Sequence, residues 1–238
     1  MNENESGSRA HPLPLQERVV LGLGRGPGEG QRATCPRLLI TGFGPFPGAP
    51  ANPTEALVAA LAGEPPEAFG AGAFRAVLLP TDYRRSWSKL RRLYATFEPD
   101  IVVHFGLAAG AGIIRVERLA NIRIDPQKPD AAGFAPRLGR AARSGSAALQ
   151  STFPAADIAA ALAAAGFEAA LSDDAGDYVC NATLYRSLAN APAGRRVGFI
   201  HVPPGRVLAA PRLHEAALSI LRAACAAEVN SRRAARSA

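Results

Sequence analysis

The feature that most constrains the fold is a run of nine residues at 100–108, DIVVHFGLA, which is apolar almost throughout. An uninterrupted run of this length is typical of a strand buried on both faces, as in the middle of a parallel sheet. Further strands are predicted at 37–43, 73–80 and 195–204, and helices at 53–62, 83–97, 154–166 and 210–229. Because strands and helices alternate, the sequence predicts a three-layer α/β/α fold with an open, mainly parallel twisted sheet.

The 238 residues divide into three predicted parts, only one of which is a folded domain. Residues 1–36 are rich in Gly, Pro and polar residues, which predicts a disordered extension. Residues 37–230 are predicted to form a single α/β peptidase-like domain, because this length buries a substantial core. Residues 231–238, SRRAARSA, are predicted to be a frayed, solvated basic tail.

Composition excludes several classes of function. The net charge is +7, but the arginines are scattered and no nucleic-acid-binding motif accompanies them, so no nucleic-acid partner is expected. Nowhere are there about 18 consecutive apolar residues, so no membrane span is expected. The three cysteines form no CxxC pair, which favours a reducing cytoplasm over a disulfide framework. Metal-ligand, Walker and GxSxG patterns are absent, so neither a metal nor a cofactor is predicted.

Cys180 lies at a junction between an extended stretch and a helical pattern. Residues 178–179 are extended in character, and residues 181–189, NATLYRSLA, predict a short helix. The free N–H groups and positive dipole end of that helix would favour the thiolate, which is a nucleophile. A buried structural cysteine is the alternative, because free cysteine is among the most buried residue types. Position alone leaves both interpretations open.

Two further residues could complete a nucleophilic site. His201 ends an apolar run and would lie at a strand tip, where functional loops gather in open α/β sheets. Glu117 lies on the polar side of an alternating stretch, 114–125, which predicts one long strand or a hairpin. A thiol, a base and an orienting carboxylate would form a triad. Taken alone, each residue is also explained as structural: a histidine bonded to the backbone and a solvated or salt-bridged glutamate. His104, inside a buried run, is predicted to be a core residue.

Four blocks of sequence resemble the pyroglutamyl peptidase I family of cysteine peptidases, also called pyrrolidone-carboxylate peptidases. The blocks are LLITGFGPFPGAPANPTEAL at 38–57, GLAAG with RVERLAN within 106–121, SDDAGDYVCNATLY at 172–185 and GFIHVP at 198–203. The resemblance implies an α/β/α fold without a cofactor, a cytoplasmic location, and a homodimer or homotetramer. It implies that Cys180 is the nucleophile, His201 the base and acid, and Glu117 the orienting carboxylate. The implied substrate is a peptide whose N-terminus is blocked by a pyroglutamyl residue.

The resemblance also implies substrate-binding residues. Phe43 and Phe46 are similar to the aromatic residues that flank the pyroglutamyl ring, and Asn52 to the asparagine that caps the following helix. Two positions depart from the family pattern: Leu107 stands where many members have Gln, and residues 127–128, Gln-Lys, lie where many have an Arg. Two alternatives therefore remain, a cysteine amidohydrolase with another acyl specificity and a catalytically silent relative that binds a ligand.

Overall fold

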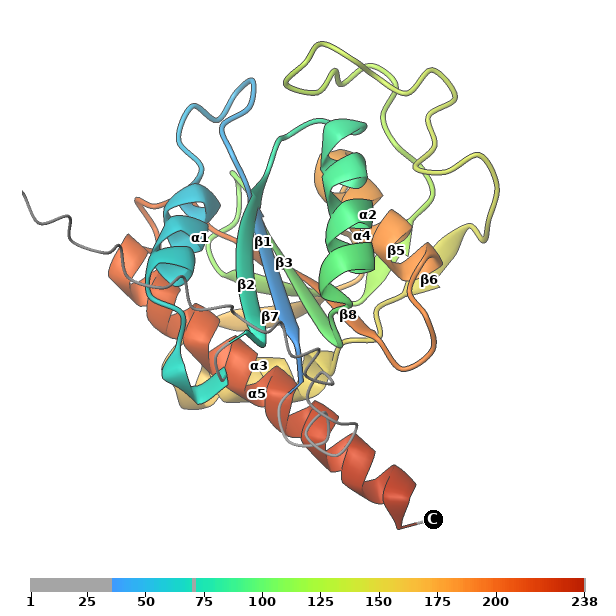
Figure 1. Cartoon of the computed structure of the whole chain (residues 1–238). Helices are drawn as coiled ribbons and strands as arrows, with labels where there is room; N and C mark the ends of the chain where they lie inside the picture. The colour runs from blue at the N-terminus through green and yellow to red at the C-terminus, as the bar shows by residue number, and fades with distance from the viewer. Residues whose placement is uncertain (1–35, 70–71, 238) are drawn as a thin grey trace, which may run out of the picture.

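The computed structural model describes residues 36–69 and 72–237, and it has the α/β/α architecture that the alternating pattern predicts (Figure 1). The predicted disordered extension, residues 1–36, lies outside the described residues except for Pro36. Six strands form the main sheet, in the order β2 (Phe74–Leu79), β1 (Leu38–Phe43), β3 (Ile101–Leu107), β8 (Arg196–Val202), β4 (Ile114–Glu117) and β7 (Ala169–Ser172). The first four run parallel, whereas β4 pairs antiparallel with β8 and parallel with β7.

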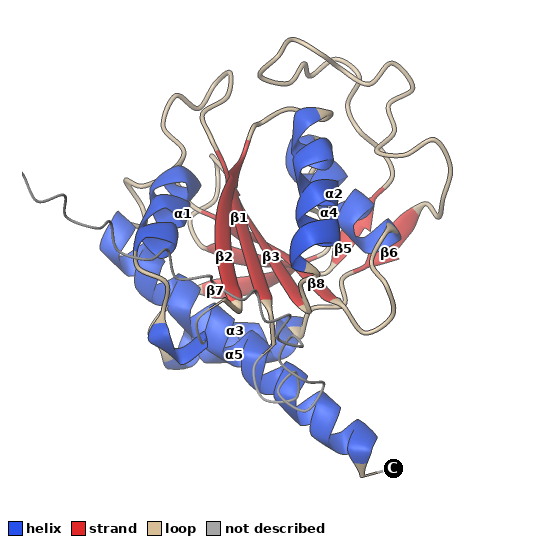
Figure 2. Ribbon diagram, viewed as in Figure 1, coloured by secondary structure: helices blue, strands red, loops and turns tan. Residues whose placement is uncertain are grey.

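Helices cover both faces of the sheet (Figure 2). One face carries α1 (Pro53–Gly63), α3 (Ala155–Ala164) and α5 (Ala210–Arg236), and the other carries α2 (Arg85–Phe97) and α4 (Val179–Ala189). A short 3-10 turn, η2 (Glu67–Phe69), follows α1. In the described part of the chain, no helix is both long and apolar enough to cross a membrane.

The central strand β3 explains the apolar run from which the fold was predicted. Ile101, Val103 and Phe105 point into the core beneath α1, α3 and α5, and Val102 points into the opposite core. His104 is also fully buried, between the hydroxyls of Thr41 (2.6 Å) and Ser187 (3.0 Å), which confirms its prediction as a core residue. Burial lowers the pKa of His104 to about 3, so its ring is neutral.

Two predicted segments differ from the structure. The stretch 114–125 is neither one long strand nor a hairpin, because the chain leaves the main sheet at Arg118, whose side chain forms an ion pair with Asp173. Beyond it, β5 (Leu119–Asn121) pairs antiparallel with β6 (Ala148–Gln150) in a separate two-stranded sheet. The predicted frayed tail instead continues α5 as far as Arg236, and Arg232 forms an ion pair with Asp100 at 2.8 Å.

Candidate active site

Cys180 lies in the first turn of α4, at the carboxyl ends of the parallel strands. The predicted helix boundary at 181 is wrong: Tyr178 is extended (φ −122°, ψ −162°) and the helix begins at Val179. The next side chain, Asn181, anchors this turn by accepting from Asn121 N–H and donating to the carbonyls of Asn121 and Arg123 (2.8, 2.8 and 3.0 Å). An amide directly after the cysteine is the sequence signal that could have identified this anchor.

A glycine in β3 makes room for the sulfur of Cys180. A Cβ atom at Gly106 would lie 2.9 Å from Cys180 Sγ and 2.6 Å from Cζ of Phe199. In the pairing of β3 with β8, Gly106 stands opposite His201. The thiol therefore lies over the strand pair that carries the histidine, although 21 positions separate these two residues in the sequence.

His201 is paired with the predicted carboxylate. Its Nδ1 lies 2.7 Å from Oε1 of Glu117, and both side chains are buried. This bond fixes the ring and leaves Nε2 for the cavity that His201 and Cys180 both line. Among the described atoms, Oε2 of Glu117 has no hydrogen-bond partner, so the carboxylate contacts His201 through Oε1 alone.

Arg115 is a cavity residue that the sequence analysis missed as a site candidate. It lies two residues before Glu117 on the same side of β4 and opposite His201 in the sheet. Its Nε is 3.3 Å from Glu117 Oε1, its Nη2 donates to the carbonyl of Asp174 (3.1 Å), and its side chain lines the same cavity as the thiol. The period-two alternation placed Arg115 beside Glu117, which is the signal that could have identified it.

The pKa of the Cys180 thiol is opposite to the sequence-based expectation. Burial and then the negative charge of Glu117 raise it to about 12, whereas the hydrogen bond of the residue's own backbone N–H acts to lower it. The helix N-terminus therefore does not by itself yield a thiolate. A base that removes the proton during the reaction is required, and His201 is the neighbouring group of that kind.

The cavity next to the thiol has a volume of about 580 Å³ and an aromatic wall. Phe43, Phe46 and Tyr178 line it, with Phe46 packed 5.9 Å from Tyr178 between ring centroids. Asn52 lines it too, and also caps α1: its Oδ1 accepts from Thr54 N–H and its Nδ2 donates to the carbonyl of Gly44, both at 3.1 Å. The loop that carries Phe46 is thus tied to the helix start, as the sequence suggested.

The departures from the family pattern lie at this cavity as well. Leu107, Gln127 and Lys128 all line it. Lys128 Nζ contacts both carboxylate oxygens of Asp177 (2.8 and 2.9 Å), so its charge is balanced at the rim. In the described part of the chain, no group of three or more His, Cys, Asp or Glu side chains could hold a metal ion.

The cavity at the carboxyl ends of the strands holds a thiol on a helix together with a histidine–carboxylate pair. This combination defines a cysteine-hydrolase site on an α/β/α scaffold. Comparison with known proteins narrows this class. The family model for pyroglutamyl peptidase matches residues 36–232. The chain is 39% identical over 178 residues to the pyrrolidone-carboxylate peptidase of Halalkalibacterium halodurans, which covers 73% of this chain and 86% of that relative.

Solved structures agree with the sequence comparison. Pyroglutamyl peptidase I of Bacillus amyloliquefaciens aligns with a TM-score of 0.71 and 30% identity, covering 81% of this chain and 97% of that one. A variant of the pyrrolidone carboxyl peptidase of Pyrococcus furiosus aligns with a TM-score of 0.72 and 30% identity, covering 79% and 97%. The chain belongs to the pyroglutamyl peptidase family of cysteine peptidases.

Proposed function

We propose that the protein hydrolyses the amide bond after an N-terminal pyroglutamyl residue of peptides. Family membership supports the reaction, and the observation that carries the assignment of residues is the thiol of Cys180 in one cavity with a histidine bonded to a buried glutamate. In this proposal Cys180 is the nucleophile, His201 the base and acid, and Glu117 the carboxylate that orients His201.

The reaction proceeds in two halves. His201 Nε2 takes the proton of the thiol while Sγ forms a bond to the carbonyl carbon that joins the pyroglutamyl ring to the next residue. Backbone N–H groups in the first turn of α4 stabilise the oxyanion, because they have no partner within the helix. The C–N bond then breaks and the imidazolium protonates the leaving amine. Water, activated by the same histidine, hydrolyses the thioester and restores the thiol.

Selectivity for pyroglutamate is supported by the shape and chemistry of the cavity wall. Phe43, Phe46 and Tyr178 offer aromatic surface to a small apolar ring. The lactam N–H and C=O need hydrogen-bond partners there, because a buried amide left unpaired costs about 1–3 kcal/mol. A peptide with a free, charged N-terminal amine is rejected because the same surface cannot solvate the charge.

A second candidate is a cysteine amidohydrolase of another acyl specificity. The observation that favours it is the presence of Leu107 and Gln127 on the cavity wall, where many family members differ. A panel of aminoacyl, N-acetyl and pyroglutamyl amides of one chromogenic amine separates the two candidates. If the protein is a pyroglutamyl peptidase, the pyroglutamyl amide should have the highest kcat/KM. A higher kcat/KM for another acyl group would instead support the amidohydrolase.

The setting we propose is a reducing cytoplasm, with the chain acting as a homodimer or homotetramer on peptides rather than on nucleic acid or membranes. The proposed chemistry supports the compartment, since Cys180 must remain reduced to act as a nucleophile. Light scattering coupled to size-exclusion chromatography of the full chain measures the assembly, and a monomeric mass at assay concentration would contradict that part.

The proposed residue roles are tested with a chromogenic pyroglutamyl amide. We expect turnover by the wild type, inactivation by a thiol-alkylating reagent, and no turnover by Cys180→Ala. His201→Ala should lower kcat/KM by at least about 10²-fold, the range for loss of a general base. Circular dichroism of both variants controls for folding. Full activity of Cys180→Ala would end the proposed mechanism, and near-intact activity of His201→Ala would remove that residue from its role.

A further inference from the structure

A second hollow, which we call the arginine pocket, is lined by several arginines and, among the described residues, by no acidic side chain. Its volume is about 740 Å³, and it is lined by five arginines: Arg84, Arg137, Arg140, Arg143 and Arg186. None of the described residues that line it is acidic, and none of these arginines forms an ion pair with another described residue. Five cations with no acidic partner among the described residues are the electrostatic footprint of an anionic ligand.

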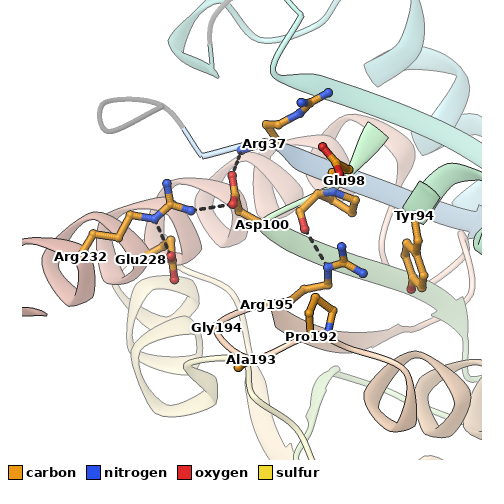
Figure 3. A pocket seen from close by; sticks show the side chains of 11 residues that line it. Arg37, Tyr94, Glu98, Asp100, Pro192, Ala193, Gly194, Arg195, Glu228 and Arg232 are labelled. Carbon is orange, nitrogen blue, oxygen red and sulfur yellow. Dashed lines mark hydrogen bonds and ion pairs between the residues drawn. The ribbon is translucent and has the colours of Figure 1, made fainter. Parts of the chain in front are cut away.

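The cavity at the opposite end of the sheet shows how this chain neutralises arginines elsewhere (Figure 3). That cavity, of about 550 Å³, also contains several arginines. There, however, carboxylates also line the cavity, and Arg232 forms ion pairs with Asp100 (2.8 Å) and Glu228 (2.7 Å). The arginine pocket therefore differs from this cavity in its lining, because its arginines gather around one hollow with no carboxylate among the residues that line it.

Two of the five arginines are held in place by the fold. Arg186 donates from Nε to the carbonyl of Ala141 (2.7 Å) and from Nη1 to the carbonyl of Tyr83, although burial lowers its pKa. The Arg84 guanidinium lies 3.9 Å from the centroid of the Phe134 ring. These contacts fix the base of the pocket, while the other three arginines are exposed around it and available to a ligand.

The arginine pocket shares a wall with the active-site cavity. Residues 127–129 line the cavity, and residues 133–138 of the same loop line the pocket. Between them, buried Asp130 accepts from the N–H groups of Tyr83 and Phe134, both at 2.9 Å. The Tyr83 ring bridges the two sites, with centroids 5.8 Å from Tyr178 on the cavity side and 6.5 Å from Phe134 on the pocket side.

We propose that the arginine pocket binds acidic side chains of the peptide substrate downstream of the cleaved bond. This inference rests on the proposed function, because it takes the peptide to leave the thiol toward the loop 127–138. An extended peptide advances about 3.3 Å per residue, so residues three to five beyond the bond span the two ring-to-ring steps between the sites. Arginine suits this role, because its planar guanidinium bonds carboxylates through two parallel N–H groups.

The test compares two pyroglutamyl hexapeptides that differ only at positions three to five beyond the cleaved bond, with Glu in one and Gln in the other. We expect the wild type to cleave the Glu peptide with about tenfold higher kcat/KM than the Gln peptide. The difference should come from a lower KM with kcat unchanged, because the contact forms equally in the ground and transition states. The ratio should fall toward one as salt is raised, because exposed charges are screened.

The triple variant Arg137→Gln, Arg140→Gln, Arg143→Gln should abolish the preference for the Glu peptide while leaving turnover of a short pyroglutamyl amide unchanged. A matched control loses three exposed arginines elsewhere, through Arg91→Gln and the α5 substitutions Arg222→Gln and Arg233→Gln. It should keep the preference.

Three results would overturn the inference: equal cleavage of both peptides by the wild type, a preference that survives in the pocket variant, or an equal loss of preference in the control. The short amide has no downstream residues, so its turnover reports the proposed function separately. If the wild type fails on the amide, the proposed function fails. If it cleaves the amide without discriminating between the peptides, only the inference fails.

Discussion

Gly106→Ala is expected to damage catalysis by moving the nucleophile rather than by removing it. A Cβ at this position would lie 2.9 Å from Cys180 Sγ, whereas ordinary contacts begin at 3.4 Å. The sulfur must therefore retreat by about half an ångström, or Phe199, at 2.6 Å, must move instead. Because about 1 Å of misplacement costs on the order of 10² in rate, we expect kcat/KM to fall roughly 10- to 100-fold.

Overpacking also costs stability, so the assay needs a control of matched strain. A Cβ at Gly198 would lie 2.3 Å from the Phe153 ring, which belongs to the core on the opposite face of the sheet. Both Gly106→Ala and Gly198→Ala should lose about 1–3 kcal/mol of unfolding free energy, measured by chemical denaturation. Only Gly106→Ala should lose activity per folded molecule.

Turnover of a chromogenic pyroglutamyl amide, corrected for the folded fraction at the assay temperature, provides the measurement. Gly110→Ala serves as the neutral reference, because nothing lies within 4 Å of the Cβ it would add. The reasoning is refuted if Gly106→Ala keeps wild-type kcat/KM, or if Gly198→Ala loses as much activity as Gly106→Ala does.

Three further predictions concern titratable groups. Glu117→Gln should lower kcat/KM by about 10²–10⁴, because His201 Nδ1 loses the carboxylate that orients its ring; a loss under threefold would contradict this role. Alkylation of Cys180 by iodoacetamide should accelerate with pH beyond 10, because the raised thiol pKa keeps the thiolate scarce at neutral pH; a plateau below pH 8 would contradict it. The pKa of His104 is near 3 in the folded state and about 6.5 in the unfolded state. The folded protein should therefore lose stability as pH falls from about 6.5 toward 3, with the unfolding constant rising roughly tenfold per pH unit. Denaturation of His104→Gln at pH 7 and pH 5 should show a correspondingly smaller acid loss than the wild type, and an equal loss would contradict the assignment.

The four parallel strands and the helices were predictable because each of them carries its own period, whereas β6 and the edge strand β7 were not predicted. The apolar run of β3 and the amphipathic α2 identify themselves within a dozen residues. The break after Glu117 was not predictable. The alternation is interrupted at Arg118 and Leu119, but the sequence alone does not show that the chain changes sheets there. The long-range pairing of β5 with β6 determines that change.

The candidate site was predictable by resemblance more than by pattern. That Glu117 contacts His201 depends on β4 running antiparallel to β8, a register set across 84 positions of sequence. The pKa of Cys180 was predicted in the wrong direction because a helix N-terminus can be recognised in a sequence, whereas the depth of burial and the nearby carboxylate cannot. Arg115 was missed as a site residue for a related reason, since alternation places it on a polar side without showing that this side faces a cavity.

The most direct test of the central claim is capture of the acyl group on the enzyme. Rapid acid quenching of a reaction with an activated pyroglutamyl ester, followed by mass spectrometry of peptide fragments, should find one pyroglutamyl group on Cys180. In His201→Ala the adduct should persist longer, because the base that activates water is gone. An adduct on another residue, or turnover of the ester without any adduct in either protein, would contradict the account.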